Sequence, residues 1–280
     1  MIGVILAAGM AKRLRPLTDT KPKCLLEVGG KTLLQRTVDA MSSAGVTEFL
    51  VVTGYRASMI RDFLASYIPP SSFLRPFGSK RQADYLLPPS SVTNIPHSCV
   101  PSVASGKPIT TRFLDNPDYE HNNNIFSLWL AMKELHGQEV LLMDSDILCD
   151  PEAVRRVVRQ ECSALAMQRH ELGEEEMKIV VDDDFHITEI SKTCRVEDAV
   201  GESVGIEKMT SDYTEAIYQE LRKMILDEGL IDIFYERAFE RLIPQGHTFK
   251  VVDTTDLFSY ELDTPEDFKR ATDSMPENLI

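Results

Sequence analysis

The chain has 280 residues, and 43% of them are hydrophobic, which is enough to bury one large core or two small ones. A formal net charge of −14 opposes binding to nucleic acid or anionic lipid, and no apolar run approaches the ~20 residues of a membrane span, so neither nucleic acid nor membrane insertion is expected. The five cysteines are scattered and never form a CxxC pair, which predicts reduced thiols in a cytoplasmic protein rather than a disulfide scaffold or a zinc site.

The chain begins with a short apolar run, residues 2–6, which predicts a buried strand. The loop over residues 6–31 has the sequence LAAGMAKRLRPLTDTKPKCLLEVGGK and combines small residues, basic side chains and prolines. Its first small residues, Ala7, Ala8 and Gly9, let backbone N–H groups come close to a ligand, and the basic side chains bring positive charge to the same place. Such a loop suits a polyphosphate, although it matches neither GxGxxG nor GxxxxGK[ST].

This loop resembles the signature of the nucleotidyltransferases that activate phosphorylated sugars and alcohols, LAAGxGxRLxPLTxxxPKxLLxVxGK. One departure is Ala11, where the sugar-activating branch usually carries glycine. The resemblance implies that Arg13 grips the triphosphate and neutralises the departing pyrophosphate. It also implies that Lys23 reaches the α-phosphate and the attacking phosphate. The nucleotide-binding residues expected in the loop are Leu6, Ala7, Ala8 and Gly9.

The next elements follow from periodicity and capping. A Thr-x-x-Gln capping box predicts a helix over residues 32–44, and an apolar run predicts a strand over residues 49–52. Gly54 and Tyr55, at the end of that strand, are expected to line the nucleotide pocket.

The stretch from about residue 69 to 108 does not fit a compact layout, because it holds eight of the fifteen prolines and shows little periodicity. A loop of this length inside a compact domain is usually functional or mobile. Two interpretations stay open: a surface excursion or dimer contact, which would make the protein a homodimer, and a lid or flap that selects the acceptor.

The segment EHNNNIFSLWLA, residues 120–131, indicates the branch of the family. It resembles a stretch of the cytidylyltransferases that activate phosphocholine and related small phosphates or phosphonates. An Asn side chain offers both a donor and an acceptor to a pyrimidine edge, so Asn123 and Asn124 are expected to read cytosine, with Ser127 nearby. The alternative is an Asn-rich turn that caps the helix beginning at Ile125.

Two acidic segments are candidates for a metal site. Residues 140–143 predict an apolar strand, and Asp146 follows at its C-terminal edge, where ligands of open α/β sheets bind. In the second segment, Pro265 and a capping box predict a helix whose start fixes Asp263 at a strand end, and alternation points Glu261 to the same side. Asp146 and Asp263 match the metal-binding pair of the resembled family, with Glu261 as a third ligand or a neighbour. Mg²⁺ suits a few carboxylates combined with phosphate oxygens.

The second half of the chain predicts a hairpin, two amphipathic helices, two strands and a last helix. Lys192, which follows the hairpin, matches a lysine that contacts the phosphate of the acceptor in this superfamily, and Lys178 is a second candidate. The predicted ranges are a strand at 164–167, the hairpin 177–190, helices around 217–225 and 235–242, strands near 249–252 and 257–262, and a helix from about 265.

Apolar strands between amphipathic helices predict an α/β fold with the sheet covered on both faces. The resemblance implies a Rossmann-like three-layer α/β/α architecture of the nucleotide-diphospho-sugar transferase type, with a mostly parallel mixed central sheet, in a single domain over residues 1–280. It implies a Mg²⁺-dependent cytidylyltransferase that joins CMP from CTP to a small phosphorylated or phosphonate acceptor such as phosphocholine or 2-aminoethylphosphonate. The alternatives are a sugar-1-phosphate nucleotidyltransferase that uses UTP or dTTP, and a non-catalytic nucleotide-binding homologue.

Overall fold

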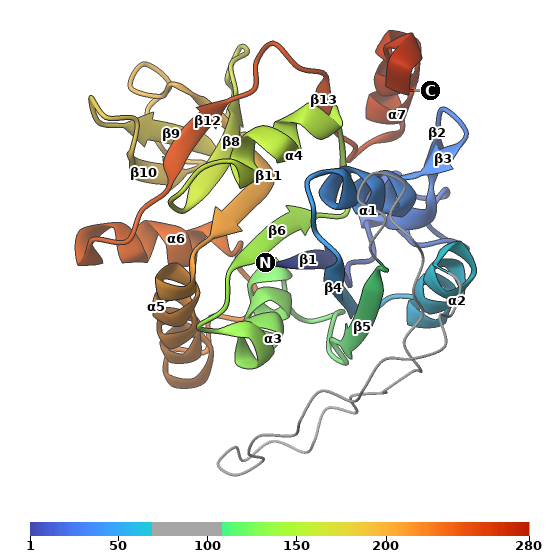
Figure 1. Ribbon diagram of the computed structural model, residues 1–280, viewed down its shortest axis with the longest axis horizontal. Coiled ribbons are helices and arrows are strands. Elements are labelled where there is room, and N and C mark those ends of the chain that lie inside the picture. The colour runs from blue at the N-terminus through green and yellow to red at the C-terminus, as the bar shows by residue number, and fades with distance from the viewer. Residues whose placement is uncertain (69–107, 280) are drawn as a thin grey trace.

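The computed structural model describes residues 1–68 and 108–279, and its centre is a nine-stranded sheet (Figure 1). The strands are β1 (Ile2–Ala7), β4 (Glu48–Thr53), β5 (Thr110–Asp115), β6 (Val140–Asp144), β8 (Ala164–Gln168), β9 (Lys178–Val181), β10 (Ile187–Ser191), β11 (Gly201–Met209) and β12 (Lys250–Asp253). Seven of them lie side by side in the order β10-β9-β11-β6-β1-β4-β5, while β8 pairs with β11 and β12 pairs with β8. The predicted insertion at residues 69–108 lies outside the described residues, apart from Pro108.

The sheet is mixed. Strands β6, β1, β4 and β5 run parallel to one another, and so do β8 and β12. Strand β11 is antiparallel to β6, β8 and β9, and β9 and β10 form the predicted hairpin. The predicted mixed sheet is therefore confirmed, with its parallel half formed by the first strands of the chain.

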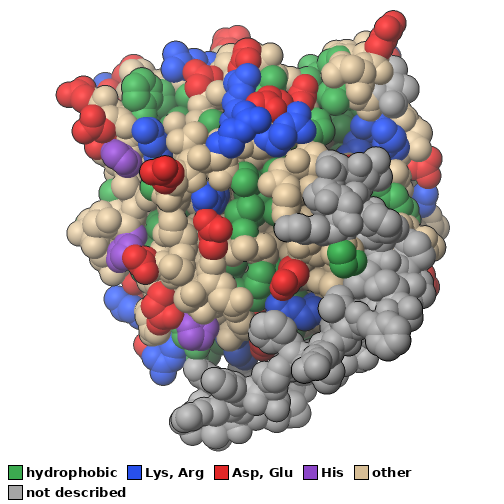
Figure 2. All heavy atoms as spheres, viewed as in Figure 1, with side chains coloured by type: hydrophobic (Ala, Val, Ile, Leu, Met, Phe, Trp, Pro, Cys, Tyr) green, Lys and Arg blue, Asp and Glu red, His purple; other side chains and the backbone are tan. Residues whose placement is uncertain are grey.

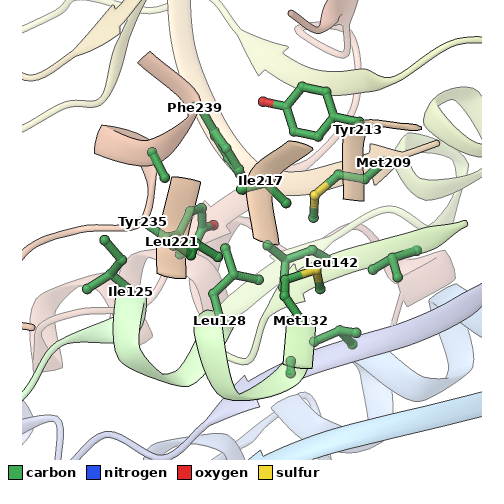
Figure 3. Packing of buried hydrophobic residues seen from close by; sticks show 14 of the residues in the cluster. Ile125, Leu128, Met132, Leu142, Met209, Tyr213, Ile217, Leu221, Tyr235 and Phe239 are labelled. Atoms are coloured by element: carbon green, nitrogen blue, oxygen red, sulfur yellow. The ribbon is translucent and has the colours of Figure 1, made fainter. Parts of the chain in front are cut away.

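Helices cover both faces of the sheet (Figure 1). Side chains alternate along a strand, so Val4 of β1 packs into one core while Ile5 packs into the other. The Val4 face is covered by α3 (Asn124–Leu135), α5 (Ser211–Arg222) and α6 (Glu236–Leu242), and the Ile5 face by α1 (Leu33–Ser43), α2 (Ala57–Tyr67) and α4 (Pro151–Val158). Figure 3 shows Leu128 and Met132 of α3 close to Ile217 of α5.

A smaller layer lies beside the main sheet. Strands β7 (Ile147–Cys149) and β13 (Ser259–Glu261) form an antiparallel ribbon, and a third apolar cluster joins it to α7 (Pro265–Ser274). A second short ribbon is formed by β2 (Glu27–Val28) and β3 (Lys31–Thr32), just before α1. This side layer anchors the second acidic segment, which contains Glu261 and Asp263.

Strand β11 was not predicted, and its polar residues explain why. Glu207 and Lys208 are both buried, which breaks the alternation that marks a strand, and Gly205 interrupts it with a φ of +67°. Lys208 is accommodated because its ammonium donates to the Gln160 carbonyl at 2.6 Å and pairs with Glu139 at 3.0 Å. Strand β5 and helix α2 were also absent from the sequence prediction.

Within the described part of the chain, no helix is both long and apolar enough to cross a bilayer. On the face seen in Figure 2, acidic and basic side chains are intermixed. The net charge of −14 is therefore not gathered into one continuous patch on that face.

Candidate active site

A cavity of about 860 Å³ opens over the C-terminal ends of the parallel strands. Strand β1 has β4 on one side and β6 on the other. The chain therefore adds strands on both sides of β1, and the strand order reverses at this point. Ligands of open α/β sheets bind at such a point, because the loops that leave neighbouring strands diverge there. The cavity is lined by residues that follow β1, β5 and β6, and it is large enough for a nucleotide together with a small acceptor.

The loop after β1 lies at this edge, and Leu6, Ala7, Ala8 and Gly9 all line the cavity. A Cβ atom added to Gly9 would meet no atom within 4 Å, so the backbone of this residue faces open space. The predicted nucleotide-binding loop thus presents bare backbone to the cavity.

The departure from the family signature has a structural consequence. Ala11 adopts a φ of 45° and a ψ of 56°, the left-handed conformation in which glycine is favoured and a Cβ atom is crowded. Its carbonyl accepts hydrogen bonds from the Leu14 amide at 3.0 Å and the Thr18 hydroxyl at 3.0 Å. These bonds hold the loop in a conformation that alanine tolerates poorly.

Gly54 and Tyr55 lie beside the cavity rather than among its lining residues, which differs from the prediction. The Tyr55 amide donates to the Ala8 carbonyl at 2.9 Å, and its hydroxyl donates to the Thr18 carbonyl at 2.7 Å. A Cβ atom at Gly54 would come within 2.7 Å of the Ala8 carbonyl oxygen. Both residues therefore support the loop after β1 on the side away from the cavity lining, because β4 ends directly beside it.

The β7–β13 ribbon brings the two acidic segments together. In its antiparallel register Ile147 lies opposite Glu261, so Asp146 precedes one partner while Asp263 follows the other. The Leu262 amide donates to the Asp146 carbonyl at 3.2 Å and extends this pairing. One ligand oxygen from each of Asp146, Glu261 and Asp263 lies within 4.8 Å of the others.

The start of α7 fixes Asp263. The predicted capping box is present: the Thr264 hydroxyl accepts from the Asp267 amide, and the Asp267 carboxylate accepts from the Thr264 amide at 2.7 Å. The same carboxylate accepts from the amide of Asp263 at 3.2 Å. These hydrogen bonds fix the backbone conformation of Asp263 from within the protein.

Lys23 joins the loop to these carboxylates. Its ammonium is 2.9 Å from Asp146 Oδ2 and 2.6 Å from Asp263 Oδ1, and the residue is only 8% exposed. Burial lowers the pKa of Lys23, but the two carboxylates outweigh it and raise that pKa above its ordinary value. Arg13 makes a second ion pair with Asp263 from the solvent side. Burial likewise opposes the ionisation of Asp263, yet Lys23 and Arg13 hold its pKa below the usual range.

The acidic cluster suits a hard divalent cation. Asp146 Oδ1 is buried and has no hydrogen-bond partner among the described residues, so this oxygen is available to a ligand. Loss of hydration, together with the carboxylates of Asp146 and Asp263, raises the pKa of Glu261 to about 8, although its side chain still reaches solvent. Three carboxylates at one point fit the oxygen-donor set of Mg²⁺.

Asn123, Asn124 and Ser127 line the cavity at the start of α3. Asn123 caps this helix by accepting from the Asn124 amide at 2.8 Å, so the capping interpretation holds for its side chain. The carboxamide oxygen of Asn124 accepts from the Tyr235 amide at 3.0 Å. Recognition of the base by these residues stays a prediction.

The sequence analysis did not identify Asn116, which connects residues of this wall to one another. Asn116 follows β5, is buried, and donates to Asn122 at 2.7 Å and to Ser127 at 3.1 Å. Its position directly after a parallel strand was a usable signal, because the C-terminal ends of such strands face the ligand. This signal was not used because strand β5 was not predicted.

Lys192 also lines the cavity. Its ammonium is 3.2 Å from Glu175 Oε2 and lies 4.7 Å from the centre of the Phe234 ring. Lys178, the second candidate for the acceptor phosphate, is buried away from the cavity lining and donates to the Lys192 carbonyl at 2.6 Å. Lys178 therefore supports the backbone of Lys192 and is not placed to touch a ligand.

The chain is similar to several known proteins. Residues 3–79 match the family model of the MobA-like NTP transferase domain. The resemblance to nucleotidyltransferases is confirmed. Over 282 residues the chain is 22% identical to choline-phosphate cytidylyltransferase of Streptococcus pneumoniae, with 96% of each chain covered. Over 280 residues it is 25% identical to CMP-5'-(3-aminopropyl)phosphonate synthase of Streptomyces rubellomurinus, covering 96% of this chain and 38% of that protein.

Solved structures show the same fold. The structure of CTP:phosphocholine cytidylyltransferase from Streptococcus pneumoniae superposes with a TM-score of 0.69 at 19% identity, covering 98% of this chain and 99% of that one. The predicted nucleotide-diphospho-sugar transferase type of fold is thereby confirmed. The chain spans between 18% and 38% of the length of the first three curated relatives that it matches. Along nearly its whole length the chain is therefore similar to proteins named as nucleotidyl-transferring enzymes.

Proposed function

We propose that this protein is a Mg²⁺-dependent cytidylyltransferase that transfers CMP from CTP to a small phosphorylated or phosphonate acceptor and releases pyrophosphate. One observation carries the proposal. Lys23, Asp146 and Asp263, from three distant parts of the chain, meet at one point of the cavity beside the exposed backbone of the loop after β1. A cation between carboxylates at this place suits the transfer of a nucleotidyl group between two anions.

The chemistry requires positioned charge rather than a general base. A phosphate acceptor has a second pKa near 6, so one of its oxygens is already free to attack the α-phosphorus at neutral pH. Lys23 is buried and charged, so it can draw the attacking oxygen and the α-phosphate together. Arg13 is solvent-exposed on the same side and can neutralise the pyrophosphate that leaves.

A Mg²⁺ ion held by Asp146, Asp263 and Glu261 would supply further positive charge beside the triphosphate. The orphaned oxygen of Asp146 favours this assignment. In the described structure the Lys23 ammonium and the Arg13 guanidinium balance these carboxylates, so the bound nucleotide would share the same cations.

The choice of CTP rests on two relatives that align with nearly the whole of this chain and on the amide-rich wall. Both relatives that cover 96% of this chain are named for the transfer of a cytidylyl group or the formation of a CMP product. The wall formed by Asn116, Asn122, Asn123 and Asn124 offers amide donors and acceptors of the kind that a pyrimidine edge requires.

A pyrophosphate-release assay tests the function directly. The purified protein is incubated with Mg²⁺, one nucleoside triphosphate and one acceptor drawn from phosphoethanolamine, phosphocholine, 2-aminoethylphosphonate, glycerol phosphate and glucose 1-phosphate. Release with CTP and a small non-sugar acceptor is the expected result. Release only with UTP or dTTP and the sugar phosphate would establish the sugar-activating alternative, and nucleotide binding without any release would establish a non-catalytic homologue.

We also propose a cytoplasmic location. Cys24, Cys149 and Cys194 are buried free thiols and Cys162 is an exposed one, so none of these four described cysteines is used in a disulfide. Mass spectrometry of the native protein after thiol alkylation would reveal any disulfide that contradicts a reducing compartment.

A further inference from the structure

The cavity wall next to Asn124 contains a carboxylate that the proposed transfer reaction does not use. Glu236 is the first residue of α6, lines the cavity and is only 8% exposed. Its Oε2 atom is buried and has no hydrogen-bond partner among the described residues. An unpartnered carboxylate oxygen costs free energy, so its retention at a cavity wall points to a ligand that donates to it.

The position of Glu236 is fixed by its neighbours. The amide of Tyr235 donates to the Asn124 side chain at 3.0 Å, and its hydroxyl donates to Asp144 Oδ2 at 2.9 Å. Tyr235 is fully buried within the core that Figure 3 shows. The carboxylate of Glu236 is therefore carried by a rigid element that links the Asn124 wall to the strand end before Asp146.

The Glu236 carboxyl has no paired cation within the protein. Burial raises its pKa to about 7, and it takes part in no ion pair among the residues that the structure describes. Lys192 acts on Glu236 through its charge, but its ammonium is paired with Glu175. The wall therefore favours a ligand that brings a positive charge with it.

We propose that the acceptor carries a primary ammonium group, and that Glu236 receives this group while the phosphate or phosphonate end faces Lys23. This inference rests on the proposed function and specifies its substrate class. A hydroxyl group of a sugar or polyol would satisfy the hydrogen bond but not the charge. A quaternary ammonium would satisfy the charge but has no N–H to donate to the orphaned oxygen.

The surroundings also favour a primary over a quaternary ammonium. A quaternary ammonium is bound chiefly by the faces of aromatic rings. Among the aromatic residues that line the cavity, Phe234 is the one nearest to Glu236 in sequence, and the ammonium of Lys192 already lies over its ring. The acceptor class that fits is an aminoalkyl phosphate or phosphonate.

The test compares three acceptors that differ at one end only: phosphoethanolamine, phosphocholine and propyl phosphate. Calorimetry measures their binding to the protein loaded with CTP and Ca²⁺, an ion chosen to fill the metal site while slowing turnover. We expect phosphoethanolamine to bind at least tenfold more tightly than either of the others. Glu236→Gln should remove that preference, and it should leave the affinity for propyl phosphate within about twofold.

Glu176→Gln is the matched control. Glu176 also lines the cavity, but its carboxylate already accepts from the Gly173 amide at 2.8 Å, so the control removes the same charge without touching an orphaned oxygen. It should keep the preference for phosphoethanolamine.

Equal binding of the three acceptors to the unaltered protein would overturn the inference even if Glu236→Gln failed to fold. Loss of affinity for all three acceptors in a folded Glu236→Gln protein would also overturn it, because a structural role would act on them alike. Binding decides the inference, whereas pyrophosphate release decides the proposed function, so the two failures can be told apart.

Discussion

Replacing Lys23 by methionine tests the charge arrangement at the centre of the site. The substitution keeps most of the apolar stem and removes the ammonium that lies 2.9 Å from Asp146 and 2.6 Å from Asp263. Breaking a fully buried ion pair costs about 3–5 kcal/mol. Because the two aspartate side chains are 24% and 25% exposed, we expect a loss of about 2 kcal/mol.

The same substitution should raise the affinity for the metal. Without the ammonium, Asp146 and Asp263 repel each other, and a divalent cation relieves that repulsion. A ligand at 100 times its Kd stabilises a protein by about 2.7 kcal/mol, which is enough to offset the loss expected for Lys23→Met. Thermal unfolding with and without Mg²⁺ should therefore show a lower Tm for the variant and a larger Mg²⁺-induced increase than for the unaltered protein.

Mg²⁺ should restore the stability of the Lys23→Met protein but not its activity. If Lys23 stabilises the transition state, kcat of Lys23→Met in the pyrophosphate-release assay should fall by about 10²–10³-fold even at saturating Mg²⁺. Lys21→Met is the control, because Lys21 lies in the same loop but is exposed and 4.0 Å from Glu27. A Lys23→Met protein with kcat within twofold of the original, or with no gain from Mg²⁺, would refute the reasoning.

Three further substitutions probe the site. Asp263→Asn should leave the fold intact by circular dichroism but reduce Mg²⁺-dependent turnover at least 100-fold, and a fully active variant would remove Asp263 from the site. Ala11→Gly should raise stability by about 0.5–1 kcal/mol in urea unfolding by relieving the left-handed conformation, and a lower stability would contradict that strain. Glu261 has a pKa raised to about 8, so it stays protonated at pH 6.5 and ionises as the pH rises. The affinity for Mg²⁺ should therefore increase from pH 6.5 to 8.5, and Glu261→Gln should flatten this dependence; an unchanged slope would exclude Glu261 as a ligand.

The sequence predicted the parts of the fold in which local signals agree. The apolar runs gave β1, β4, β6 and β8, and the predicted capping box was found in place at Thr264, at the start of α7. Strand β11 was not predicted from the sequence because Glu207 and Lys208 are buried against partners that are distant in the chain. No local pattern reveals such partners. Alternation marks a strand only when each face has one kind of environment.

The candidate site divides in the same way. Family resemblance gave Lys23, Asp146 and Asp263, and the structure brings the three together. Glu236 could not be predicted, because it occupies the first turn of a helix where an acidic residue is ordinary. Only the packing of α6 against the strand end of Asp144 shows that its carboxylate reaches the cavity with an oxygen left unpaired.

The convergence at Lys23 depends on two separate features of the fold. Lys23 is 123 residues from Asp146 and 240 from Asp263. Adjacent parallel pairing of β1 and β6 brings the first pair to one edge of the sheet, whereas the register of β7 with β13 brings in Asp263. Because side chains alternate along a strand, a shift of that register by one residue would turn Glu261 away and move Asp263 along the ribbon. The acidic cluster is therefore specified by the pairing of two three-residue strands. The capping box at Thr264 reinforces this pairing by fixing the backbone of Asp263, which follows β13.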